Sequence, residues 1–263
     1  MNNRPPAVAG TFYPAKKAAL EKMVEEFLED CEKGNVGGKL RALVVPHEGY
    51  AYSGVVAAAG YRLLSLMEEQ PKKIVLIGPS HYAAFYGLAR PSLLEWDTPL
   101  GMVKADFIED LAGKSGLVIE SERAHAPEHS LEVQLPFLQK VMKRGFTVFP
   151  VLSNQVNAKE AAEYLGAVVG DSENFIIVSS DLSHYLPYQA AKKTDEKTSK
   201  IITGIDLASA AQLDACGRMG IEIAMSIAKD FGWKCAQIDL RNSGDTAGDK
   251  SAVVGYGCFA FFE

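Results

Sequence analysis

The 263-residue sequence contains only four cysteines, Cys31, Cys216, Cys235 and Cys258, and no CxxC pair or other ligand spacing connects them. Each cysteine stands in an apolar context, so we expect reduced, buried side chains rather than a disulfide framework or a zinc ribbon. A chain of this length buries enough surface to fold without cross-links. Neither a disulfide nor a structural metal is therefore needed for folding.

Excess positive charge and long apolar runs are also missing. The formal net charge is -6, which argues against binding nucleic acid or anionic membranes through bulk charge. The longest strongly apolar stretch, AVVGYGCFAFF, has 11 residues, too few to span a bilayer. The N-terminus lacks the apolar core of a secretion signal. We therefore expect a cytoplasmic protein that binds neither nucleic acid nor membrane.

Several common catalytic motifs do not occur. The sequence has no GxSxG elbow, no GxxxxGK[ST] phosphate loop and no HExxH zinc helix. The glycines Gly34, Gly37 and Gly38 come between a helix and a strand and are typical of a helix stop, not of a dinucleotide fingerprint. The chemistry must therefore come from residues that the fold brings together.

Apolar runs and helical patterns alternate along nearly the whole chain. Strands are predicted at LRALVV, KIVLIG, LVIES, FTVFPVL, FIIVSS, KCAQIDLRN and AVVGYGCFAFF, and helices over 15–33, 53–67, 105–113, 130–143, 158–169, 185–203, 208–215 and 219–231. Ser53 is the expected cap of the second helix, and Pro136 implies that the helix over 130–143 begins late or bends. This alternation predicts an α/β fold with a mostly parallel or mixed sheet, flanked by helices on both faces. We expect one domain over 1–263 and a hairpin formed by the last two strands.

Histidine or aspartate follows four of the predicted strands. His81 comes directly after IVLIGPS, and His47 follows LRALVVP. FIIVSS leads to Asp181 and His184, and CAQIDLRNSG leads to Asp245. Ligands of open parallel sheets bind outside the carboxyl ends of the strands, and adjacent strands lie only about 5 Å apart. If these four strands are neighbours, their side chains form one site.

Histidines and a carboxylate of this kind favour a metal site with an acid or base beside it. Two imidazoles and one carboxylate with open positions suit non-haem Fe(II), and the same atoms suit Zn(II). A further histidine not bound to the metal would act as acid or base. Asp181 either orients His184 or caps the turn after its strand. His129, just before a predicted helix, is a second catalytic candidate, whereas Pro127 argues against a helical metal pair of His125 with His129.

Aromatic residues occur beside these positions. Phe12 and Tyr13 lie near the N-terminus, and Tyr50 and Tyr52 follow His47. They either wall a ligand pocket or belong to the apolar core. The residues themselves leave both readings open.

Six segments together resemble one protein family. AGTFYPA, VPHEGYAYSG, IGPSH, EHSLEVQLPFL, SSDLSHY and SGDTAGDKSAVVGYG, in this order, resemble the Memo-like family, the B protein of the AmmeMemoRadiSam set. The resemblance runs from about residue 4 to the C-terminus. The family is similar in fold to class III extradiol dioxygenases, which implies an α/β domain with a metal site or the remains of one.

The resemblance implies roles for individual residues. By position, His47 and His81 are the histidine ligands of the metal, while His184 matches a catalytic histidine and Asp181 its companion. Phe12 and Tyr52 match pocket aromatics that are implicated in peptide binding by animal members.

The third metal ligand departs from the family pattern. Animal members carry a cysteine there and the dioxygenases a glutamate, whereas this chain has SGDTAGD, a loop that holds none of its cysteines. Asp245 is the expected substitute, with Asp249 as the alternative. A carboxylate in place of a thiolate favours a hard, dioxygenase-like site of two nitrogens and one oxygen.

These expectations lead to three functional hypotheses. The first is a metal-dependent redox enzyme in which His47, His81 and Asp245 hold Fe(II), and His184 is the acid or base. The second is a non-catalytic module that binds a peptide or small anion on a vestigial active site without metal. The third is a Zn(II)-dependent hydrolase. The expected partner is a small-molecule or peptide ligand, and the sequence leaves the substrate and the oligomeric state open.

Overall fold

The centre of the molecule is a parallel β-sheet, shown by a computed structural model that describes residues 3–107, 116–169 and 174–263. Strands β8 (Thr147–Asn154), β3 (Lys73–Pro79), β9 (Asn174–Ser179) and β2 (Leu40–Val45) are adjacent in this order and parallel. Their residues are almost all buried, as expected for strands covered on both faces. The carboxyl ends of these strands therefore lie at one edge.

The C-terminal strands make the sheet mixed. Strand β12 (Val253–Phe262) pairs antiparallel with β2, and β11 (Lys234–Asn242) pairs antiparallel with β12. This arrangement confirms both the predicted mixed sheet and the predicted C-terminal hairpin. It also places β12 between β11 and the parallel strands.

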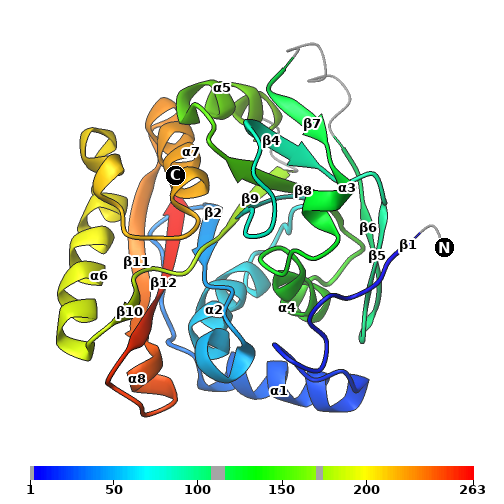
Figure 1. Cartoon of the computed structure of the whole chain (residues 1–263), viewed down its shortest axis with the longest axis horizontal. Helices are drawn as coiled ribbons and strands as arrows, with labels where there is room; N and C mark the ends of the chain where they lie inside the picture. Colours follow the sequence, from blue (N-terminus) through cyan, green and yellow to red (C-terminus); the bar gives the residue numbers. More distant parts are fainter. Residues whose placement is uncertain (1–2, 108–115, 170–173) are drawn as a thin grey trace.

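Helices cover both faces of the sheet because alternate strand residues point to opposite sides. Leu43 and Leu76 belong to one apolar core, together with α1 (Lys17–Asp30), α2 (Tyr50–Ser65) and α4 (Leu135–Val141). Val44 and Ile77 belong to a second core, with α5 (Ala158–Val169) and α7 (Arg218–Phe231). Figure 1 shows these two helical layers on opposite sides of the strands.

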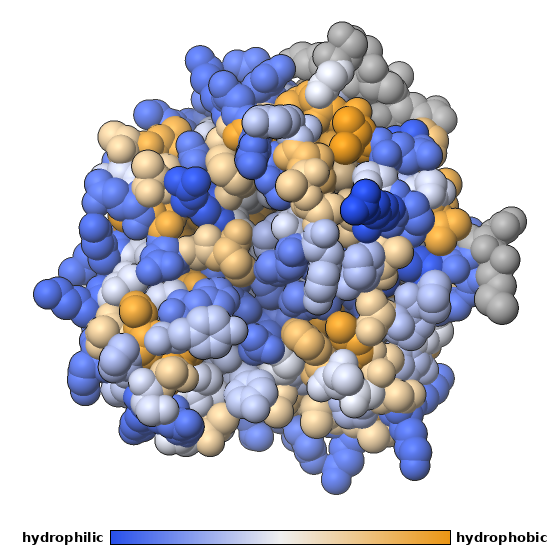
Figure 2. Space-filling model, in the orientation of Figure 1, coloured by the Kyte–Doolittle hydropathy of each residue, from blue (hydrophilic) through white to orange (hydrophobic). Residues whose placement is uncertain are grey.

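The surface is mostly hydrophilic, because the apolar side chains lie largely between the layers. Figure 2 shows small hydrophobic patches separated by hydrophilic residues on one face of the molecule. Helix α6 (Tyr188–Thr203) packs on β11 and β12 and covers the hairpin side of the sheet. Among the helices the structure describes, none has the length and apolarity required to cross a bilayer.

Several short elements were not foreseen. The irregular stretch after His81 contains β4 (Gly87–Arg90), β5 (Glu95–Thr98) and β6 (Gly101–Ala105), and β5 also pairs with β1 (Asn3–Arg4). These strands are short and carry charged residues, so no alternating pattern marks them. Strand β7 (Val118–Glu120) lies within the strand predicted at LVIES, and η3 (Leu207–Gln212) overlaps the short helix predicted over 208–215. The remaining short elements are α3 (Glu122–His125), η2 (Glu132–Gln134), β10 (His184–Leu186) and α8 (Ser243–Thr246).

Two of the predicted helices have different bounds in the structure, and a third lies mostly outside the described residues. Helix α2 begins at Tyr50 rather than after Ser53, and the Ser53 hydroxyl donates a hydrogen bond to the Glu48 carbonyl from inside the helix. The helix predicted over 130–143 is split into η2 and α4, and Pro136 stands in the first turn of α4, where its missing N–H is not needed. Most of the short helix predicted over 105–113 lies outside the described residues.

Candidate metal centre

Three histidines meet at the carboxyl edge of the parallel strands. His47 lies two residues after β2 and His81 two residues after β3, with β9 between these strands. The ring centroids are 5.2 Å apart for His47 and His81, 5.6 Å for His47 and His129, and 4.8 Å for His81 and His129. The strand-end histidines and His129 thus form one cluster.

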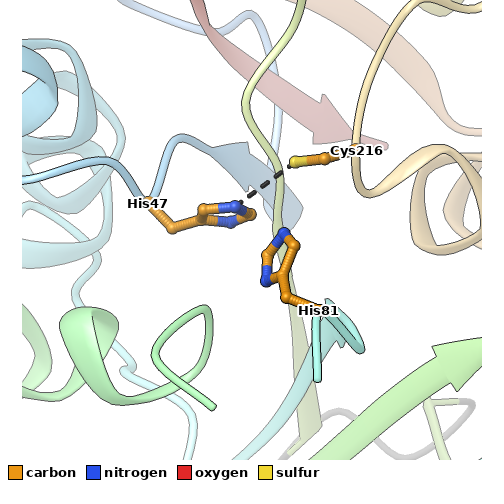
Figure 3. A group of neighbouring side chains, drawn as sticks. All are labelled: His47, His81 and Cys216. Carbon is orange, nitrogen blue, oxygen red and sulfur yellow. Dashed lines mark hydrogen bonds between the residues drawn. The ribbon is translucent and has the colours of Figure 1, made fainter. Parts of the chain in front are cut away.

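Cys216 adds a sulfur atom to this cluster. Its Sγ lies 3.3 Å from Nε2 of His47, and the nearest ligand atoms of His47, His81 and Cys216 all lie within 4.8 Å of one another. Figure 3 shows these side chains converging from separate segments of the chain. The expectation that every cysteine is a plain buried side chain is therefore corrected at Cys216.

The Cys216 loop, residues 213–217, is fixed against the end of β9. The Cys216 N–H donates to the Asp181 carbonyl at 3.3 Å, and the Gly217 N–H donates to Ser180 Oγ at 2.9 Å. Sequence reasoning missed Cys216 because nothing in its spacing connects it with the histidines. One feature distinguishes Cys216 from the other cysteines and could have marked it as a site candidate. Cys216 lies in a loop between helices, whereas Cys235 and Cys258 lie within strands and Cys31 ends a helix.

Gly217 has no room for a side chain. A Cβ atom at this position would lie 2.6 Å from Cβ of Ser180 and 2.7 Å from the Ser179 carbonyl oxygen. We expect Gly217→Ala to destabilise the fold by about 1–3 kcal/mol, as overpacking does, and to push Cys216 away from His47. Urea unfolding measures the first effect and metal affinity the second. Gly37→Ala, at a position with open space, is the control; equal effects at both glycines would contradict this packing.

The structure does not bring Asp245 to the histidines. Its Oδ2 accepts the Asn242 N–H at 3.0 Å and its Oδ1 accepts the Tyr188 hydroxyl at 2.6 Å, which makes it part of the capping box of α8. The alternative, Asp249, accepts hydrogen bonds from Ser251 within its own loop. The expectation of a carboxylate third ligand from this loop is corrected, because β12 separates β11 from β2 and the loop carboxylates serve local turns.

Glu128 orients His81. Its Oε1 lies 2.9 Å from Nδ1 of His81, and its Oε2 accepts the His81 backbone N–H at 2.7 Å. Burial alone would raise the pKa of Glu128, but the hydrogen bonds and charge of His81 and the Ser130 N–H lower it to about 2. Because an ionised carboxylate only accepts, Nδ1 of His81 carries a proton, and Nε2 is the nitrogen left free when the ring is neutral. Burial opposes protonation of His81, yet Glu128 raises its pKa overall.

Asp181 accepts hydrogen bonds from the backbone at His47. Its Oδ1 accepts the backbone N–H groups of His47 and Glu48 at 2.8 and 3.3 Å, and its Oδ2 lies 3.7 Å from Nε2 of His47. Burial raises the pKa of Asp181 to about 7. Ligand atoms of Asp181, His184 and Cys216 also lie within 4.8 Å of one another. Asp181 and His184, which were predicted to be companions, thus lie close together. The hydrogen bonds that Asp181 accepts, however, come from the backbone of the loop that carries His47.

His129 is the third histidine of the cluster, and its side chain is mostly buried. Its Nδ1 is buried, makes no hydrogen bond within the described residues and lies 3.5 Å from Oε1 of Glu128. Burial lowers the pKa of His129, as it lowers that of the fully buried His47, so both rings are neutral near pH 7. His125, by contrast, is a core residue whose Nε2 contacts the Ala89 carbonyl at 3.0 Å.

The predicted aromatics divide between site and core. The Phe12 ring packs on His129 with centroids 4.7 Å apart, and Tyr52 is 45% exposed at the start of α2. Tyr13 and Tyr50 are buried, and their hydroxyls donate to Glu132 and to the Val133 carbonyl. Phe12 therefore borders the histidines, while Tyr13 and Tyr50 stabilise the fold.

Comparisons with known proteins show the family of this chain. The family model described as "Memo-like protein" matches residues 4–260. A MEMO1 family protein of Aquifex aeolicus is 36% identical over an alignment of 271 positions, which covers 97% of this chain and 98% of the relative. Another, from Ignicoccus hospitalis, is 37% identical over 287 residues and covers 98% of both chains. The histidine segments, the mixed sheet and these relatives together show that the chain belongs to the Memo-like protein family.

Proposed function

We propose that this protein binds one redox-active metal ion through Nε2 of His47, Nε2 of His81 and Sγ of Cys216. The observation that carries the proposal is the convergence of these three ligand residues within 4.8 Å. Bonds of about 2.1 Å to nitrogen and 2.3 Å to sulfur place the ligand atoms of one ion roughly 3–4 Å apart. The separation of 3.3 Å between His47 Nε2 and Cys216 Sγ falls in this range.

The surroundings of the ligands fit a metal. Metal-binding histidines usually donate their other ring N–H to a carboxylate or another acceptor, which fixes the tautomer. Glu128 supplies such an acceptor to His81, and Ser179 Oγ lies 3.0 Å from Nδ1 of His47. Both imidazoles are thus poised to offer Nε2. Three protein ligands also leave coordination positions open, as in catalytic rather than structural sites.

Fe(II) is the ion that we propose, because the three ligands leave open positions as in non-haem iron sites of two histidines and one carboxylate, with the thiolate here in place of the carboxylate. The thiolate makes the donor set softer than the two-nitrogen, one-oxygen set expected from the sequence, and copper and Zn(II) are the main competitors. Bound there, iron would supply a redox and Lewis-acid centre. In this proposal the neutral His129 accepts or donates the proton of a bound ligand, His184 is a second acid or base, and Phe12 shields His129 from water.

Exposed tyrosines beside the site support a small-molecule or peptide ligand. Tyr82 contacts the rings of His81 and His129, and Tyr185 contacts His184, while both remain more than half exposed. Tyr185 has a φ of 59°, a left-handed conformation that costs of order 1–3 kcal/mol for a bulky residue and is common at ligand sites. Together with Tyr52 these rings suit an aromatic or partly apolar ligand. The same surface would serve a binding module without catalysis.

Metal titration tests the proposal. The protein is purified anaerobically, stripped of metal, and titrated with Fe(II), Zn(II) and, as a spectroscopic probe, Co(II). We expect one ion per chain, and a thiolate-to-metal charge-transfer band with Co(II). Weak binding of several ions without this band would refute the site and favour the metal-free binding module.

A further inference from the structure

We propose that Ser179 and Gln134 are positioning residues that fix His47 in the tautomer with its proton on Nδ1, so that Nε2 faces Cys216 as a free electron pair. The effect of this tautomer on metal binding rests on the function proposed above. The tautomer itself does not depend on that proposal. The proposal follows from donors and acceptors in a buried chain of hydrogen bonds that runs from α2 through η2 to the end of β9.

The orientation of the Gln134 amide starts this chain. Nε2 of Gln134 lies 2.9 Å from the carbonyl of Pro46, which can only accept a hydrogen bond. The Tyr61 hydroxyl donates to Oε1 of Gln134 at 2.8 Å. Both side chains are buried. The amide nitrogen therefore faces Pro46, and its second hydrogen points to Ser179 Oγ at 2.8 Å.

The Ser179 hydroxyl has no hydrogen left for His47. A hydroxyl carries one hydrogen, and the Ser130 carbonyl, 2.5 Å away, takes it because a carbonyl only accepts. Ser179 Oγ already accepts from Gln134, and its remaining electron pair faces Nδ1 of His47 at 3.0 Å. Nδ1 must therefore be the donor in this contact.

The consequence appears at the other ring nitrogen. A neutral imidazole with its proton on Nδ1 has a free electron pair on Nε2, the atom 3.3 Å from Cys216 Sγ. Without metal, this nitrogen is an acceptor within reach of the Cys216 S–H, which also lies 3.6 Å from the Asp181 carbonyl. With metal, the same nitrogen is a ligand without any change of tautomer.

One short segment governs both histidines. The carbonyl of Ser130 accepts from Ser179, which orients His47, and the N–H of Ser130 donates at 2.9 Å to Glu128, which orients His81. His129 lies between these two residues in the chain. The segment Glu128–Ser130 thus aligns both imidazoles and also carries His129, the third histidine of the cluster.

Nitrogen NMR of the metal-free, reduced protein tests the tautomer. With ¹⁵N-labelled histidine, only five side chains need assignment. We expect His47 in the wild-type protein to be neutral with its proton on Nδ1. A wild-type His47 protonated on Nε2 would overturn the proposal, with no variant needed and even if the protein bound no metal.

Substitution of Ser179 then tests its consequence. We expect Ser179→Ala to give a mixture of His47 tautomers and to weaken Co(II) binding by about 10–100-fold, as loss of an outer-shell partner does. Ser179→Thr, which keeps the hydroxyl, should restore both. Ser153→Ala is the matched control, because Ser153 is also buried at the end of a parallel strand, β8, and donates to the Gly78 carbonyl.

The outcomes separate this proposal from the proposed function. An unchanged tautomer and affinity in Ser179→Ala would overturn it, as would an equal loss in Ser153→Ala. If Ser179→Ala does not fold, the wild-type His47 tautomer still decides the proposal, and Ser179→Thr, which keeps the hydroxyl, should leave that tautomer unchanged. A wild-type chain with the expected tautomer but no metal site would refute only the proposed function.

Discussion

Replacement of Cys216 by alanine is expected to abolish stoichiometric metal binding. The thiolate supplies the negative charge of the proposed centre, and the remaining ligands are two neutral imidazoles. Loss of an outer-shell partner alone typically costs about 10–100-fold in affinity, and loss of a direct ligand should cost more. Metal content after anaerobic purification and Co(II) titration measure this effect, and the thiolate charge-transfer band should disappear.

Two other variants make this result specific. Cys235→Ala removes a partly exposed cysteine of β11 that belongs to no candidate metal group in the described part of the chain, and it should keep the metal. Asp245→Asn should also keep it, because that carboxylate caps α8. Full metal content in Cys216→Ala together with loss in Asp245→Asn would reverse the assignment and restore the two-nitrogen, one-oxygen site.

Replacement of Glu132 by alanine is expected to lower the free energy of unfolding by about 3–5 kcal/mol, the usual cost of leaving one charge of a buried ion pair without its partner. Glu132 and Arg4 are 0% and 1% exposed, and Oε2 of Glu132 lies 2.7 Å from Nη1 of Arg4. The same carboxylate accepts the N–H groups of Ala7 and Val8 and the hydroxyl of Tyr13. Chemical denaturation monitored by circular dichroism measures the loss.

The effect should extend to the site. Glu132 holds the N-terminal segment that carries Phe12, and Phe12 packs on His129. Glu21→Ala is a suitable control, because Glu21 forms an exposed pair with Lys17 and such pairs contribute about 0–1 kcal/mol. A loss below 1 kcal/mol in Glu132→Ala would show that the buried pair is not what anchors this segment. Replacing both Arg4 and Glu132 by apolar residues should cost less than Glu132→Ala alone.

The predicted fold was largely correct because its evidence is local. Runs such as Ile74–Ile77 are apolar at every position, which only a strand covered on both faces requires, and helix α5 has the predicted bounds of Ala158 and Val169. The short strands β5 and β6 were missed because pairing partners, rather than a sequence pattern, make them strands.

The sequence could place His47 and His81 at the site, since each directly follows a strand of the parallel sheet. It could not place the third ligand. Asp245 also follows a strand, but β12 inserts between β11 and β2, and strand order is a property of the whole fold. Cys216 lies 169 positions after His47 in the sequence, and it contacts His47 because its loop packs on the end of β9.

The sequence by itself thus determined the α/β architecture with helices on both faces of the sheet and the edge at which the histidines gather, because periodicity and strand ends depend on neighbouring residues. Only the tertiary structure decided that a thiol completes the cluster, that Glu128 and Ser179 leave Nε2 of both histidines free, and that Glu132 anchors the N-terminal segment. These features depend on contacts between segments far apart in the chain, which no local pattern encodes.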